Sequence, residues 1–102
     1  MAGHESAKMQ EQMVDRLCEA LCTLESPQEA RALLADLCTV RETAEFAQRL
    51  EVARLLSQKT SYVDIQEKTG ASATTISRVS KCLNSGAGGY AVVLDRLGTN
   101  ED

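Results

Sequence analysis

The feature that most constrains the fold of this chain is a series of sequence signals for the start of a helix, which recur along its length. The letters SPQE at 26–29 form a capping box with proline at the first helical position, and TVRE at 39–42 forms a second box. Thr60 or Ser61, with Asp64 downstream, completes a third box. Apolar residues return at helical spacing between these starts, and no convincing pair of strands is present. The pattern predicts an all-α fold.

The helices are expected to form one domain, because 102 residues suffice for a single modest core. Along residues 1–102 we expect an N-terminal dimerisation helix (1–25), central helices (26–60), a helix-turn-helix (61–85) and a C-terminal helix (90–97). The apolar stripe of the first helix runs from Met9 to Leu24. The longest central helix has seven apolar residues available for burial: Ala44, Phe46, Ala47, Leu50, Ala53, Leu55 and Leu56.

The composition favours closely packed helices and a partner chain. Aromatic residues make up only 3% of the sequence, so Ala, Leu and Val must fill the core. The stripes over 9–24 and 40–57 present more apolar surface than a monomer of this size covers easily. We therefore expect a homodimer whose contact is made mainly by the N-terminal and central helices.

Residues 69–78, TGASATTISR, place a glycine between two short helical segments. Ile65 lies in the first segment, which ends at Gly70. Ser72 is placed to cap the second segment, in which Ile76 and Val79 face inward. Two short helices joined by a tight glycine-containing turn are typical of a helix-turn-helix, although an ordinary helix hairpin with a polar face has the same spacing.

The exposed face of the second segment suits a groove of double-stranded DNA. Small side chains and hydroxyls at its N-terminus can approach base edges, and the free backbone N–H groups there favour a phosphate. From Ser72 to Asn84 the only charges are Arg78 and Lys81, both positive, although the net charge of the chain is −4. The candidate DNA-binding residues are Ser72, Ala73, Thr74, Thr75, Ser77, Arg78 and Lys81.

An enzyme is a poor alternative. The sequence has no Gly-rich phosphate loop and no carboxylate pair with a pocket signal, and its single histidine, His4, lies close to the N-terminus. Neither catalytic residues nor a cofactor are therefore expected. Cys18 and Cys22 lie one helical turn apart, but a lone Cys-x3-Cys pair is weak support for zinc, so no metal is expected.

The four cysteines are instead expected to be small buried residues of a protein in a reducing compartment. The N-terminus lacks the apolar core of a signal peptide, and no apolar run is long enough to span a membrane. These features predict a cytoplasmic protein with no membrane partner.

From about Arg31 to Leu97 the sequence resembles the Trp repressor superfamily, most closely its small Trp-repressor-related (YerC/YecD-type) members. The letters that carry the resemblance are ALLADLCTVRE at 32–42, RLEVARLLSQKTSYVDIQEKTGASATTISRVSKCLN at 49–84, and LDRL at 94–97. The most specific part is 70–83. The resemblance implies an all-α, intertwined homodimer that binds operator DNA through a helix-turn-helix and regulates transcription, and we expect a repressor.

The resemblance also implies a small-molecule site between the long central helix and the recognition helix. The Trp repressor holds its corepressor there, with two arginines beside the indole ring and threonine, glycine and serine positions around it. By position the arginines correspond to Arg49 and Arg78, and two threonines correspond to Thr39 and Thr75. These residues form a candidate effector pocket.

Two positions of that pocket depart from the tryptophan-binding pattern. Val79 stands where the tryptophan-binding member has glycine, and its isopropyl group fills space that an indole needs. Cys82 stands where that member has serine, and a thiol is a weak acceptor for an ammonium group. We therefore do not expect tryptophan to be the effector. Either another effector binds, or the site is filled and DNA binding is constitutive.

A second class of function has the same fold. A protein-interaction module could keep these helices, lose DNA binding, and use the acidic N-terminal helix as its contact surface. Retention on a DNA column, and its loss with salt, distinguishes the two hypotheses.

Overall fold

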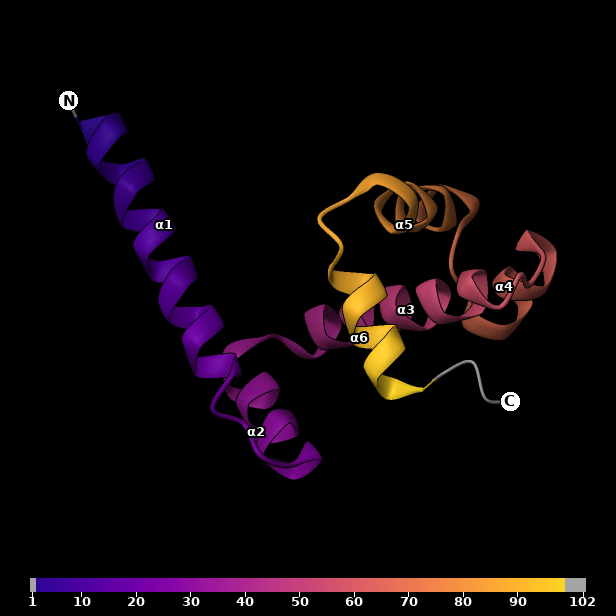
Figure 1. Cartoon of the computed structure of the whole chain (residues 1–102), viewed down its shortest axis with the longest axis horizontal. Helices are drawn as coiled ribbons and strands as arrows, with labels where there is room; N and C mark the ends of the chain where they lie inside the picture. The colour runs from indigo at the N-terminus through magenta and orange to yellow at the C-terminus, as the bar shows by residue number, and fades with distance from the viewer. Residues whose placement is uncertain (1, 99–102) are drawn as a thin grey trace. The chain divides into compact units, whose positions relative to one another are not determined.

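The computed structural model describes residues 2–98, and side chains from residue 5 onward. Met1, residues 99–102 and the side chain of His4 lie outside the described part. The described residues form six helices and no strand (Figure 1). The helices are α1 (Ala2–Leu21), α2 (Pro27–Leu37), α3 (Val40–Ser57), α4 (Tyr62–Thr69), α5 (Ala73–Ser85) and α6 (Gly89–Leu97). The predicted all-α fold is confirmed.

The chain divides into two compact units, Met1–Thr39 and Val40–Asp102. The single domain of residues 1–102 and the homodimer stay predictions. In the first unit, α1 ends at Leu21, before residue 25 of the predicted N-terminal helix and before Leu24, the last residue of its apolar stripe. Its end is set locally, because the Ala20 carbonyl accepts from both the backbone N–H of Thr23 at 3.0 Å and the Thr23 hydroxyl at 2.6 Å.

The start of α2 is the predicted capping box. Ser26 Oγ accepts a hydrogen bond of 3.1 Å from the backbone N–H of Glu29, and Pro27 occupies the first helical position. The Glu29 carboxylate accepts 2.9 Å from the N–H of Glu25, one residue before the cap. Ser26 and Glu29 thus fix where this helix begins.

The first unit buries little. Every described side chain of α1 is exposed, and α2 has no buried residue. The expectation that all four cysteines are buried was wrong, because Cys18, Cys22 and Cys82 are exposed and Cys38 is half-buried. Cys18 lies in the exposed helix α1, and Cys22 is the first residue after it. The exposed large apolar residues of this helix are Met9, Met13, Val14, Leu17 and Leu21.

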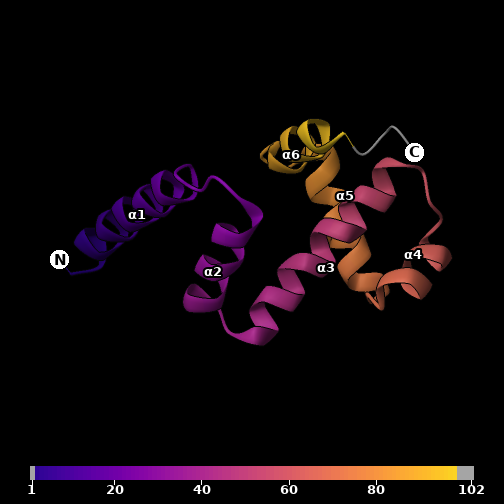
Figure 2. The same cartoon turned by 90° about the horizontal axis from the view of Figure 1, so that it is seen from below.

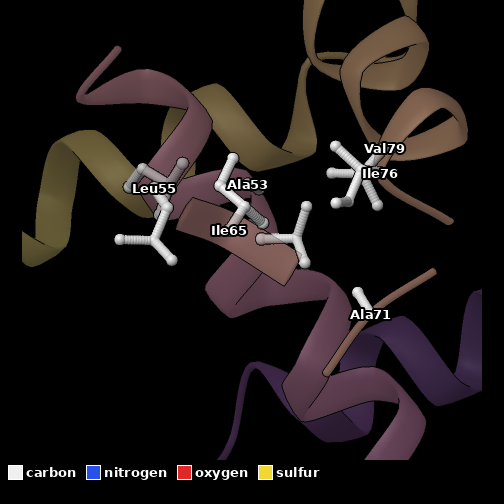
Figure 3. Close-up of a cluster of buried hydrophobic side chains, with 8 residues drawn as sticks. Ala53, Leu55, Ile65, Ala71, Ile76 and Val79 are labelled. Carbon is white, nitrogen blue, oxygen red and sulfur yellow. The ribbon is translucent and has the colours of Figure 1, made fainter. Parts of the chain in front are cut away.

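The second unit holds the core. Helix α3 contacts α4, α5 and α6, and Figure 2 shows α5 lying against α3. Figure 3 shows apolar side chains of α3, α4 and α5 that form one buried cluster, with the turn residue Ala71 at its edge. The buried residues are Val52, Ala53, Leu55, Ile65, Ala71, Ile76, Val79 and Leu94, with Leu56, Leu83 and Tyr90 packed against them.

Only the second half of α3 contributes to this core. Ala53 and Leu55 are buried and Leu56 is half-buried, and all three were among the residues that the sequence made available for burial. In the first half, Phe46 is 46% exposed and Leu50 36% exposed, and Ala44 and Ala47 are exposed as well. The N-terminal half of α3 therefore keeps an apolar surface that the described chain leaves open.

Candidate functional site

Helix α4 has a defined start and a defined end. Ser61 is its N-cap, and its hydroxyl oxygen accepts 3.2 Å from the backbone N–H of Asp64. At the other end Gly70 adopts the left-handed conformation, with φ 75° and ψ 4°, and its N–H donates 2.9 Å to the Gln66 carbonyl. Glycine adopts this conformation without a Cβ penalty, so the residue type and the turn agree.

The turn between α4 and α5 is held by side chains. The Thr69 hydroxyl donates 2.7 Å to the Ile65 carbonyl and accepts 3.1 Å from the N–H of Ala71. Gln48 of α3 donates from Nε2 to the Thr69 carbonyl at 3.0 Å. Ala71 is buried at 4% exposure. The turn is thus fixed both from within and from the central helix.

Helix α5 begins at the predicted cap. Ser72 Oγ accepts 3.1 Å from the backbone N–H of Thr75, and the hydroxyls of Ser72 and Thr75 lie 3.2 Å apart. An N-cap of this kind satisfies one of the N–H groups that the first turn leaves without a partner. The remaining N–H groups of that turn carry partial positive charge.

The two faces of α5 differ sharply. Ile76 and Val79 lie in the core at 0% and 2% exposure. Of the candidate DNA-binding residues, Thr75 is half-buried and six are exposed: Ser72, Ala73, Thr74, Ser77, Arg78 and Lys81. This face therefore presents small and hydroxyl side chains at the start of the helix and two cations further on.

A groove of about 480 Å³ opens between α3, α5 and the start of α6. Five of the six candidate effector residues line it: Arg49, Thr75, Arg78, Val79 and Cys82. Thr39 belongs to the first unit and is not among the lining residues. Sequence reasoning missed the other three, which are Glu45, Gln48 and Tyr90.

Both polar and apolar side chains line the groove. The guanidinium of Arg49 lies over the ring of Phe46, with 5.1 Å from Cζ to the ring centroid, a cation–π distance. Val79 lines the groove and is also part of the core, so its isopropyl group forms part of the base. Glu45 lines the groove as well, and its carboxylate pairs with Arg41 at 3.9 Å.

A second charged pair on α3 is bidentate. Arg54 donates from Nε to Glu51 Oε1 at 3.0 Å and from Nη2 to Oε2 at 2.5 Å. The side-chain hydrogen bond from Arg54 lowers the pKa of the Glu51 carboxyl; burial opposes this effect, and the charge of Arg54 adds to it. Neither residue lines the groove.

Two negative observations concern the described residues only. Within the described part of the chain, no three His, Cys, Asp or Glu side chains gather as metal ligands would. None of the described helices combines the length and the apolar character needed to cross a membrane.

The fold and this geometry define an all-α helix-turn-helix protein with an exposed second helix. The chain belongs to the Trp repressor protein family, which matches residues 12–98. This is a family of regulators and not a class of enzyme. The chain is 42% identical to the uncharacterised protein YerC of Bacillus subtilis (strain 168) over 94 residues, which cover 92% of this chain and 90% of YerC.

Two solved structures have the same fold. A TrpR-like protein from Eubacterium eligens superposes with a TM-score of 0.86 at 44% identity, over 94% of this chain and 99% of that one. A protein from Staphylococcus aureus, described provisionally as a Trp repressor, gives 0.85 at 38% identity, over 94% and 96% of the two chains. At these identities the likeness extends beyond the fold to the family.

Proposed function

We propose that this protein is a sequence-specific DNA-binding transcriptional regulator, a repressor, that acts as a homodimer through its helix-turn-helix. The observation that carries the proposal is the two-faced character of α5. One face is anchored in the core by Ile76 and Val79, and the other is exposed, free of acidic residues, and contains Arg78 and Lys81. Membership of the Trp repressor protein family supports the same function.

The division of work along α5 follows from side-chain size. Ser72, Ala73 and Thr74 stand at the N-terminus, where short side chains allow the helix to approach base edges in the major groove. Arg78 and Lys81 stand further along, where their length and charge suit the phosphates on the groove wall. Ser77 is exposed between these two groups and the half-buried Thr75 supports the first turn.

A dimer accounts for the exposed apolar surfaces. Val40 is 90% exposed, and Phe46 and Leu50 extend the open surface along α3. The stripe of α1 is open as well, from Met9 to Leu21. Apolar surface of this kind gains about 25 cal/mol per Å² when it is removed from water, which favours a partner. A second copy suits the function, because a two-fold dimer reads two half-sites.

DNA binding in this proposal does not require tryptophan. The groove keeps Arg49 and Arg78, but Val79 forms part of its base and Cys82 lines its wall. An indole would have to displace a side chain that is 2% exposed and packed in the core. We therefore propose either a different effector or constitutive binding. A DNA-binding regulator of this kind works in the cytoplasm.

Selection from a random pool tests the function directly. Protein is incubated with random double-stranded DNA, bound duplexes are recovered over several rounds, and the native mass is measured by light scattering at micromolar concentration. We expect the mass of a dimer and enrichment of a site with two related half-sites. A monomeric mass would contradict the dimer, and a pool that stays random would contradict sequence-specific binding.

The same experiment also tests the second hypothesis, that the protein is an interaction module without DNA binding. Exposed carboxylates line α1, among them Glu11, Asp15 and Glu19, and they are the surface on which such a module would depend. A dimer that binds no duplex at low salt, and that is not retained on a DNA column, would favour this second function.

A further inference from the structure

We infer that Gln48 is a positioning residue for the helix-turn-helix, which holds the turn against α3 and so sets the direction in which α5 leaves α4. The inference rests on the proposed DNA-binding function for its effect on DNA. The hydrogen bond that carries it joins Gln48 Nε2 to the Thr69 carbonyl oxygen at 3.0 Å.

The carbonyl of Thr69 needs an external donor. Thr69 is the last residue of α4, and the last carbonyls of a helix have no partner within it. Both Gln48 and Thr69 are half-buried, so water reaches this bond poorly. A carbonyl that loses its donor in such a place costs more than one that faces solvent.

The backbone of the turn makes one hydrogen bond of its own, from the Gly70 N–H to the Gln66 carbonyl at 2.9 Å. Gly70 follows Thr69 directly, and glycine has the widest choice of backbone conformations of all residues. A turn built on glycine therefore depends on neighbouring contacts for its orientation. On the α4 side those contacts are made by Thr69, whose hydroxyl accepts from the N–H of Ala71 and whose carbonyl accepts from Gln48.

From Thr69 the constraint reaches the start of α5 within three residues. Ala71 is buried in the core, and Ser72 caps α5 by accepting from the N–H of Thr75. A displacement of Thr69 is passed on to the first turn of α5, where Thr74 is placed to meet base edges. Base contacts depend on side-chain position more strictly than phosphate contacts do.

Gln48 can be replaced without overpacking. It lines the open groove rather than the closed core, so a side chain of equal length has room there. Gln48→Met keeps the length and removes the donor. Gln48→Lys restores a donor on a side chain that is one atom longer and carries a positive charge. Leu55→Val is the matched control, because it shortens a core side chain of the same helix and leaves the Gln48–Thr69 bond intact.

The experiment measures amide hydrogen exchange at Ala71, the melting temperature, and affinity for the selected duplex at a temperature at which every variant is folded. In Gln48→Met we expect exchange at Ala71 and the dissociation constant for DNA each to rise about tenfold, the size of one lost hydrogen bond. The slope of log K against log salt should stay that of the wild type, because no phosphate contact is lost.

The control and the donor-restoring variant separate positioning from general stability. Leu55→Val should melt lower than the wild type and bind DNA as tightly as the wild type does. Gln48→Lys should return Ala71 exchange and DNA affinity to wild-type values with an unchanged salt slope. A steeper slope in Gln48→Lys would place residue 48 at a phosphate and overturn the inference.

Two further outcomes are distinct. Wild-type exchange at Ala71 together with wild-type affinity in Gln48→Met would overturn the inference and leave the proposed function intact. Wild-type protein that binds no duplex would overturn the proposed function. Hydrogen exchange at Ala71 would then test by itself whether the Gln48–Thr69 bond holds the turn. Faster exchange in Gln48→Met supports that role of Gln48, and an unchanged rate overturns it.

Discussion

The side-chain amide of Gln48 donates to the backbone carbonyl of Thr69 across 21 residues of sequence, and this bond ties the central helix α3 to the end of α4. Gly70 comes next in the chain, and a Cβ added there would lie 3.9 Å from Gln48 Nε2, an ordinary contact. Space does not require glycine at residue 70. The left-handed backbone does, because its φ is 75°.

Gly70→Ala is therefore expected to destabilise the protein through its backbone alone. A residue with a Cβ in the left-handed region costs about 1–2 kcal/mol relative to glycine. Urea unfolding followed by circular dichroism measures the change in the free energy of unfolding.

Gly89→Ala is the control for that substitution. Gly89 is the first residue of α6, nothing lies within 4 Å of an added Cβ, and its φ is not in the left-handed region. Alanine there should change stability by less than about 0.5 kcal/mol or raise it slightly. Equal losses in the two variants would contradict the assignment of strain to residue 70.

The helix starts could be predicted because their signals are local. Ser26, Ser61 and Ser72 each accept from the N–H three residues on, so four consecutive letters contain the whole interaction. Burial is not local in this sense. The stripe predicted in α3 has helical spacing throughout, yet Phe46 and Leu50 stay exposed while Ala53 and Leu55 are buried. Spacing cannot say which chain covers a stripe.

The candidate site, like the fold, could be predicted only where its signals are local. The start of α5 follows from its cap, whereas the groove combines residues from three helices. Gln48, Glu45 and Tyr90 were missed because their place depends on how α3 and α6 pack. One signal existed for Gln48. It precedes Val52 by four residues and Leu55 by seven, so it is a polar residue on the buried face of its helix and needs a partner.

Adding tryptophan tests whether the groove between α3, α5 and α6 can hold an indole. Adding L-tryptophan at millimolar concentration should leave the melting temperature and the affinity for selected DNA unchanged if, as we propose, Val79 occupies space that an indole needs. Any ligand that binds only the folded state must raise its apparent stability by mass action. A clear rise in melting temperature would therefore show that the groove admits tryptophan.

The pair of Glu51 and Arg54 predicts a small dependence of stability on pH. Since the folded-state pKa of Glu51 lies below its ordinary value, its contribution is present above that ordinary value and is lost as the pH falls through the lowered one. The Glu51 side chain is 46% exposed, so solvent screening limits the contribution to less than about 1 kcal/mol.

Urea unfolding of the wild type and Glu51→Gln, at a series of pH values from 7 downward, measures this contribution. The wild type should be the more stable at pH 7, and the difference should shrink as the pH falls through the lowered pKa of Glu51. Glu45→Gln is the matched control, because Glu45 pairs with Arg41 at 3.9 Å with both side chains well exposed. It should change stability less at pH 7. An advantage of the wild type that stays the same size over the whole pH series would contradict the role of the Glu51 charge.

The last prediction separates two functions within α5. Thr74 lies in the first turn and is exposed, so its side chain is expected at base edges. Lys81 lies two turns further on and is exposed, and its hydrocarbon stem and ammonium group suit a phosphate. Base contacts carry about 1–3 kcal/mol of discrimination, whereas phosphate contacts give affinity that weakens with salt.

Lys81→Ala should therefore weaken binding to every duplex and lower the slope of log K against log salt by about one per subunit. Thr74→Ala should change which duplex is preferred and leave the slope nearly intact. Fluorescence anisotropy on the selected site and on its single-base variants, at several salt concentrations, measures both quantities. If Lys81→Ala changed sequence preference alone and Thr74→Ala changed nothing, α5 would not lie in the major groove of the DNA in this orientation.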